Sequence, residues 1–516
     1  MKQRLQKSLL VALLAAALSG CAVGPDYVRP AVEMPVTWRV TYPQAAELSN
    51  LHWWEQFDDP ALDALIETAL LENRDIRVAA ARVDQYLGQL ATTRSQFFPQ
   101  LGYGLDASRN KMSQRSISAP PAGTDLWYKQ YQGSVSADWQ IDLFGRVRRQ
   151  TEAAQAQVYS SEEGRRGTLL TVVSSVASGY VSLRALDRKL EIARATATNY
   201  EGSLKIFQAR FKGGVVSQVE VSQIDAQYQQ ALASVPALER QVAAQENLLC
   251  VLLGRVPGAI PRGKTIDELK LPQIPPGLPS SLIERRPDVL AAEQNLVAAN
   301  ANIGVARSLY FPTLSLTGML GSVSTAMSTF MTGPAGVAMA AASLSGPIFT
   351  FGNIEGQVRS AEAREQEALA QYQQTILVAL RETNDALTGA QKAGEAYEAQ
   401  AKRVTVLREY ARLSRLRFEN GSASYLEVYS AENELFGAEL TAVDGSADRI
   451  LELVAIYKAL GGGWVEAADV LTKPKPDVSD GTAGSTNPDN ADRAAKAEDT
   501  AETTTPETTT ISDKPS

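Results

Sequence analysis

The sequence has one histidine, His52, and two cysteines, Cys21 and Cys250. A single histidine leaves no histidine-based metal cluster and no Ser-His or Cys-His pair for nucleophilic catalysis. Since no complete phosphate-cradling glycine motif occurs either, we predict that the protein is not an enzyme and holds no metal. The formal net charge of −8 is the opposite of the basic surface that binds phosphate backbones, so we expect no nucleic-acid partner.

Long apolar runs are also scarce. The run at residues 9–18 is too short for a transmembrane helix and follows Lys2, Arg4 and Lys7, as in a secretory signal. No later apolar run is long enough for a transmembrane helix. Any crossing of a membrane must therefore be made by β-strands.

Cys21 ends this signal. The run Leu18-Ser19-Gly20-Cys21 closely resembles a bacterial lipobox, in which the cysteine receives the lipid, and Ala22 fits sorting to the outer membrane. We expect residues 1–20 to be a lipoprotein signal peptide and acyl chains such as palmitate on Cys21 to be the only attached group, with no other cofactor. An ordinary signal peptide with an incidental cysteine is the alternative. Once Cys21 is lipidated, Cys250 has no partner for an intramolecular disulfide.

Two glycine turns indicate that the chain is an internal duplication. Phe211 and Phe418 lie 207 positions apart, and the same offset relates Gly214 to Gly421. The surrounding runs are Arg210-Phe211-Lys212-Gly213-Gly214 and Arg417-Phe418-Glu419-Asn420-Gly421. We therefore divide the chain into an N-terminal arm at 21–59, a first repeat at 60–254, a linker at 255–280, a second repeat at 281–464 and a disordered tail at 465–516. The arm is rich in proline and tryptophan and has no helical period, so we expect it to be extended.

Each repeat contains two segments of alternating polarity. They lie near residues 101–108 and 134–142 in the first repeat and near 314–320 and 337–348 in the second. Their lengths approach the ~9–11 residues of a tilted transmembrane strand. Four strands cannot enclose a lumen, and open edges are not tolerated in lipid, so several copies must pool their strands. Two ordinary soluble hairpins are the alternative.

The remaining pattern is helical. Residues 146–211 have no proline and predict a helix of about 60 residues, or roughly 90 Å. The returning segment carries a coiled-coil seam, and Pro236 should kink it. The apolar stripes of these seams are narrow. This pattern favours helices packed side by side in a curved wall that has one face exposed to water. A purely structural coiled-coil rod is the competing interpretation.

These features together resemble the outer membrane factor, or TolC-like, family, and within it the lipoprotein channels of resistance-nodulation-division efflux pumps. The resemblance covers about residues 18–464. It rests on the lipobox and on the motifs Trp53-Trp54-Glu55-Gln56-Phe57-Asp58-Asp59-Pro60, Phe98-Pro99, Asp142-Leu143-Phe144-Gly145-Arg146, Arg285-Arg286-Pro287-Asp288, Phe311-Pro312 and Leu460-Gly461-Gly462-Gly463-Trp464.

The resemblance implies an α+β membrane protein that forms a homotrimer. Its twelve-stranded outer-membrane β-barrel, with four strands from each chain, would continue into a twelve-helix periplasmic α-barrel. The implied partners are a periplasmic membrane-fusion adaptor, an inner-membrane efflux pump and outer-membrane lipid. The implied location is the cell outer membrane, lipid-anchored and membrane-spanning, with a large periplasmic extension.

The resemblance also assigns residues to the periplasmic end. The hairpin tips, with Gly213, Gly214, Val215, Gly421 and Ser422, are expected to contact the adaptor, the glycines supplying a positive φ or a tight approach. The resting gate is expected at Leu426, Glu427 and Ser430. Ser430 stands where many relatives have aspartate, so one acidic ring is expected to be missing unless Glu427 replaces it. Glu427 facing only solvent is the alternative.

Three functions remain open on the sequence. An efflux exit duct predicts drug hypersensitivity when the gene is deleted. A type I protein-secretion channel of the same architecture predicts loss of a secreted protein instead. A non-transporting coiled-coil lipoprotein scaffold predicts no pore. The alternating strands argue against the scaffold, and the lipobox favours the efflux duct.

Overall fold

The computed structural model describes residues 22–30, 52–115, 121, 123–271 and 285–461. Several predictions fall outside these residues: the signal peptide, the lipidated Cys21, residues 31–51 of the arm, residues 272–280 of the linker, and the tail. The chain divides into the units Met1–Thr472 and Lys473–Ser516, and everything described below belongs to the first.

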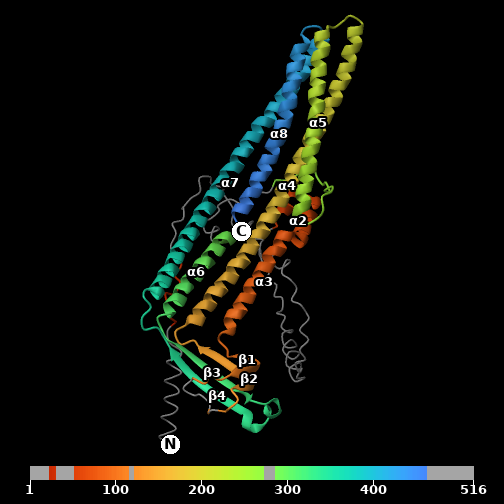
Figure 1. The fold of residues 1–516 in the computed structure, drawn as a ribbon. Helices are drawn as coiled ribbons and strands as arrows, with labels where there is room; N and C mark the ends of the chain where they lie inside the picture. The colour runs from red at the N-terminus through yellow and green to blue at the C-terminus, as the bar shows by residue number, and fades with distance from the viewer. Residues whose placement is uncertain (1–21, 31–51, 116–120, 122, 272–284, 462–516) are drawn as a thin grey trace, which may run out of the picture. The chain divides into compact units, whose positions relative to one another are not determined.

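The two repeats contribute matching elements, shown in Figure 1. The first contains η2 (Trp53–Phe57), α2 (Pro60–Glu72), α3 (Arg74–Ser95), β1 (Gln100–Lys111), β2 (Trp127–Ile141), α4 (Arg146–Lys212) and α5 (Gln218–Leu252). The second contains α6 (Pro287–Ser308), β3 (Thr313–Ser324), η4 (Met327–Thr329), η5 (Gly333–Ala335), β4 (Gly336–Ser345), α7 (Asn353–Glu419) and α8 (Tyr425–Ala459).

Helices in the two copies have the same lengths. Helices α4 and α7 each have 67 residues, α5 and α8 each have 35, and α3 and α6 each have 22. The long pairs begin 207 positions apart, which is the offset between the glycine turns. Pro236 lies inside α5 without ending it.

The helices form a wall one helix thick. In the half that adjoins the strands, the order of packing is α3, α4, α6, α7 (Figure 1). In the other half, the contacts between helices give the order α5, α4, α8, α7. Helices α3 and α5 thus lie at one end of the wall and α7 at the other. The largest core gathers where η2, α2, α4, α5 and α8 meet, and Ile260, Ile266 and Leu269 of the linker are buried in it.

The strands form one antiparallel sheet in the order β1-β2-β3-β4. The register opposes Tyr103 to Val135 and Val135 to Leu320, so these side chains share one face. Ser134 and Ser136 point to the other face because neighbouring residues of a strand alternate. The outer edges of β1 and β4 have no strand partner among the described residues.

Three expectations need correction. The arm was expected to have no helix, but residues 53–57 form a 3-10 helix, because Trp53 is buried and stacks on Tyr457 of α8 at 5.2 Å. The fourth strand was expected to reach residue 348, but β4 ends at Ser345 ahead of Pro347. Among the described helices, α4 has a window apolar enough for a membrane span, with mean hydropathy 1.4; 72% of that window is buried, as in a core helix.

Candidate functional site

One face of the sheet is apolar and open to solvent. Tyr103 is 85% exposed, and its neighbours on the same face are also exposed. The larger members of this face are Leu101, Tyr103, Leu105, Val135, Trp139, Leu320 and Leu344. A contiguous exposed apolar surface of this kind marks an interaction site, and on paired strands of 10–15 residues it fits hydrocarbon.

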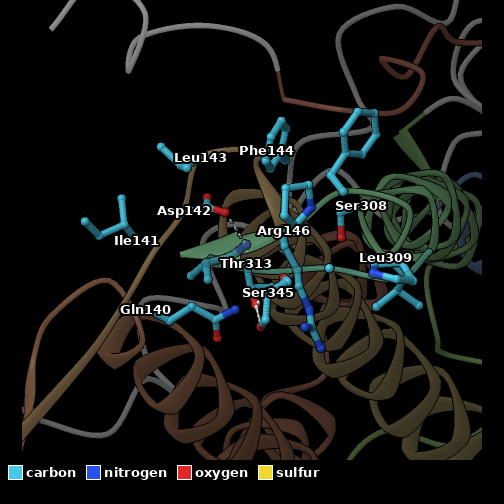
Figure 2. A pocket seen from close by; sticks show the side chains of 15 residues that line it. Gln140, Ile141, Asp142, Leu143, Phe144, Arg146, Ser308, Leu309, Thr313 and Ser345 are labelled. Carbon is cyan, nitrogen blue, oxygen red and sulfur yellow. Dashed lines mark hydrogen bonds between the residues drawn. The ribbon is translucent and has the colours of Figure 1, made fainter. Parts of the chain in front are cut away.

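A short turn, residues 142–145, joins β2 to α4. Asp142 accepts hydrogen bonds from the backbone nitrogens of Val147 and Arg148, at 3.1 and 3.0 Å, and so satisfies donors at the start of α4. Phe144 stacks on Phe311 from the other repeat, with ring centroids 4.7 Å apart. Figure 2 shows a pocket of about 320 Å³ at this junction, with Asp142, Ser308, Thr313 and Ser345 around it.

Residues 22–29 dock beside the same junction. The backbone nitrogen of Val23 donates to the oxygen of Phe144 at 3.1 Å, and Arg149 pairs with Asp26 at 2.6 Å. Further along, Asn300 of α6 donates to the oxygen of Pro25, and Tyr27 donates to Glu293. Cys21 itself lies outside the described residues, but the residue after it is held where the strands meet the helices.

The hairpin tips have the same turn in both repeats. Gly214 and Gly421 adopt φ of 73° and 69°, and the next residue in each copy donates its backbone N–H to the carbonyl five residues earlier, at 2.9 Å. This is the glycine-terminated helix end expected from the sequence. Gly213 differs from expectation because its φ is −82°, so only Gly214 needs the left-handed conformation. Val215 and Ser422 are exposed at the tips.

A compact apolar cluster joins the two hairpins just behind their tips. It contains Leu204, Phe207, Val221, Ile224, Tyr425 and Val428. Phe207 of the first hairpin packs on Phe418 and Tyr425 of the second, with centroids 5.7 and 4.7 Å apart. Burial raises the pKa of the Tyr425 hydroxyl, so it stays neutral and bonds to Gln227 at 3.3 Å. The tips are therefore held together by packing.

The expected gate residues lie on the first turns of α8. Leu426 is 57% exposed, Glu427 and Ser430 are half-buried, and the intervening Val428 points into the apolar cluster. Glu427 accepts a hydrogen bond from Arg417 at 2.6 Å. Its carboxylate is therefore paired with a side chain and does not contact only solvent. In the first repeat the matching Glu220 instead accepts from the backbone nitrogen of its own cap, Ser217, at 2.7 Å.

Sequence reasoning missed Arg417 as the partner of Glu427. Two further ion pairs cross the same hairpin, Arg408–Glu439 and Arg415–Glu432. From the first pair to the second, the arginine moves seven residues forward along the chain and the glutamate moves seven residues back. That spacing is a usable signal for antiparallel helices, since seven residues make two turns. Arg417 and Glu427 lie beside the turn of the hairpin and do not continue this seven-residue spacing. Their pairing could therefore not be predicted from it.

Comparisons with known proteins agree with this geometry. A family model described as outer membrane efflux protein matches residues 65–255 and again 278–462. The chain is 34% identical over 468 residues to the probable efflux pump outer membrane protein TtgC of Pseudomonas putida, covering 89% of this chain and 96% of TtgC. It is 31% identical over 462 residues to the cation efflux system protein CusC of Escherichia coli, covering 88% and 98%.

A solved structure of an outer membrane channel has a similar fold. The open state of the MtrE outer membrane channel of Neisseria gonorrhoeae superimposes with a TM-score of 0.77 at 28% identity, covering 86% of this chain and 99% of MtrE. Since 86% of this chain is covered, most of the fold described above belongs to a known architecture.

Proposed function

The chain belongs to the outer membrane efflux protein family and is the outer-membrane exit duct of a tripartite efflux system; from this premise we propose that it works as a homotrimer. Its proposed partners are a periplasmic membrane-fusion adaptor and an inner-membrane pump. It would conduct drugs or other toxic compounds passively to the cell exterior, because the pump supplies the energy. The carrying observation is that, among the described residues, the sheet and the helical wall both end in edges without a strand or helix partner.

The free edges favour three copies. A sheet in lipid must close, because unpaired backbone groups in hydrocarbon are too costly. Two copies would supply eight strands, and a barrel of about eight strands is filled by its own side chains. Three copies supply twelve strands and leave a lumen, and β4 of one copy then meets β1 of the next.

Exposed apolar side chains on the end helices support the same closure. On α7, Leu377, Val406 and Leu413 are exposed, and their spacings of 29 and 7 residues place them on one face. On the opposite end of the wall, Leu232 and Leu248 of α5 are exposed as well. We propose that α7 of one chain packs on α3 and α5 of its neighbour, which completes a ring of twelve helices.

Deletion of the gene tests the efflux role. We expect the deletion strain to become hypersensitive to toxic compounds and to regain resistance when the wild-type gene is restored. Unchanged sensitivity together with loss of a secreted protein would favour the type I secretion channel. Unchanged sensitivity and unchanged secretion would favour the scaffold.

The lipid on Cys21 is a separate prediction. We expect wild-type protein to incorporate labelled palmitate and the variant Cys21→Ala to incorporate none. Both should fractionate with the outer membrane, because the strands hold the protein there without the acyl chains. The measurement is metabolic labelling followed by membrane fractionation, and an unlabelled wild-type protein would show that Cys21 is incidental.

The gate is proposed at Leu426, Glu427 and Ser430, and the adaptor contacts at the tips. Leu426→Ala or Glu427→Ala is expected to raise single-channel conductance in planar bilayers, since the first removes an apolar constriction and the second frees Arg417. Glu220→Ala is the matched control, because this glutamate caps its own helix. Unchanged conductance in both gate variants, or an equal rise in the control, would remove these residues from the gate.

A further inference from the structure

A groove of about 580 Å³ lies between α4, α6 and α7, on the side of these helices near the strands. Its polar lining consists of the arginines Arg146 and Arg364 and the amide side chains Gln157, Asn295, Asn302 and Gln357. No carboxylate lines it; the other lining residues are alanine, valine, leucine and serine. We call this surface the arginine groove.

Neither arginine of the groove has an ion pair or a side-chain hydrogen bond among the described residues. Nearby carboxylates are taken by other arginines: Asp142 pairs with Arg148, Glu152 with Arg149 and Glu362 with Arg307. In Figure 2 the Arg146 guanidinium lies well away from the Asp142 carboxylate. The groove therefore presents two guanidinium groups that have no ion pair among the described residues, together with amide donors.

The groove lies on the face of the wall opposite to the docked segment 22–29. That segment contacts α6 at Glu293, Asn300 and Gly304. The groove uses Asn295, Asn302 and Ala306, each two residues further along. With 3.6 residues per turn, two positions turn a helix by about 200°, so the two sets face opposite ways. The segment that follows the proposed lipid on Cys21 must lie outside a closed wall, and the groove then lies inside.

A second groove on the same face has a different lining. It has a volume of about 720 Å³, shares Asn295 with the arginine groove, and is lined by Asp75, Glu163 and Asp288 with no lysine or arginine. Two of these carboxylates already have partners, since Glu163 pairs with Arg166 and Asp288 with Arg286.

We propose that the arginine groove is a contact site for anionic groups, carboxylate or phosphate, carried by molecules that pass through the duct. Guanidinium groups bind such oxygens in a bidentate manner, and amide donors complete the coordination. This inference rests on the proposed duct, because only a closed trimer makes the groove part of a lumen. Three copies would place six arginines along the first three turns of these helices, just before the barrel.

The ion selectivity of the purified protein in planar bilayers tests the proposal. In a KCl gradient, Arg146→Gln/Arg364→Gln is expected to raise the permeability of K⁺ relative to Cl⁻ about twofold, a modest change because salt screens charges in a wet pore. Millimolar pyrophosphate should reduce the wild-type current and have less effect on this variant. Arg146→Lys/Arg364→Lys should keep the wild-type ion selectivity but lose part of the pyrophosphate effect, since lysine keeps the charge without the bidentate geometry.

Arg359→Gln is the control, because Arg359 is exposed on α7 but does not line the groove. A conducting wild type whose selectivity and pyrophosphate response are unchanged in the double glutamine variant would overturn the inference while leaving the duct intact. Equal changes in the control would overturn it too. A wild-type protein that forms no channel would overturn the duct itself, and this inference with it.

Discussion

Replacing Asp59 with alanine is expected to lower the free energy of unfolding by about 3–5 kcal/mol, because several buried hydrogen bonds to one carboxylate are lost together. Asp59 is fully buried. It accepts from the backbone nitrogen of Ala61 at 3.0 Å, the hydroxyl of Tyr180 at 2.7 Å and the backbone nitrogen of Lys264 at 3.0 Å. It thereby ties the start of α2 to α4 and to the linker.

The loss of stability is measured from the intrinsic tryptophan fluorescence during denaturant unfolding, to which the buried Trp53 contributes. The adjacent Asp58 provides the control, since its side chain is 52% exposed and pairs with Lys264 and Lys270 at 2.6 and 2.9 Å. These lysines hold the pKa of Asp58 at about 2, so its pairs persist at neutral pH and are lost only as the pH falls toward that value. Asp58→Ala should have a much smaller effect; equal losses for both variants would show that Asp59 does not hold the three segments together.

Placing glutamates on the exposed apolar face of α7 is expected to abolish the trimer. Val406→Glu/Leu413→Glu would bury two unpaired carboxylates at each of three interfaces, and each costs several kcal/mol. The variant should be extracted from membranes as single chains and should neither conduct in bilayers nor restore efflux. The measurement is light scattering during size-exclusion chromatography in detergent.

Thr405→Glu is the matched control for this change. Thr405 is also exposed on α7, but one residue from Val406 a helix turns by about 100°, so it points to a different side. The control should remain a trimer. A trimer in the Val406/Leu413 variant would show that this face of α7 is not a subunit interface.

Local patterns in the sequence were enough to predict the repeated elements. The glycine turns predicted the ends of α4 and α7, since a left-handed residue after a long helix leaves few other choices. The alternation of Leu101, Tyr103 and Leu105 with small or polar residues predicted β1 and its apolar face, because the period of a strand is two. Both signals depend only on neighbouring residues.

Features that depend on tertiary packing could not be predicted in this way. The 3-10 helix at Trp53 exists because that ring stacks on Tyr457, about four hundred positions later. Glu220 and Glu427 occupy equivalent positions in the two repeats, yet one caps its helix and the other pairs with Arg417. The arginine groove joins Arg146 to Arg364 through α6, and no spacing in the sequence relates these two residues.

The number of chains in the detergent-extracted complex, counted by native mass spectrometry, tests most directly the claim that the free edges of sheet and wall close between copies. Three chains are expected in each particle. A particle with a single chain would contradict closure between copies.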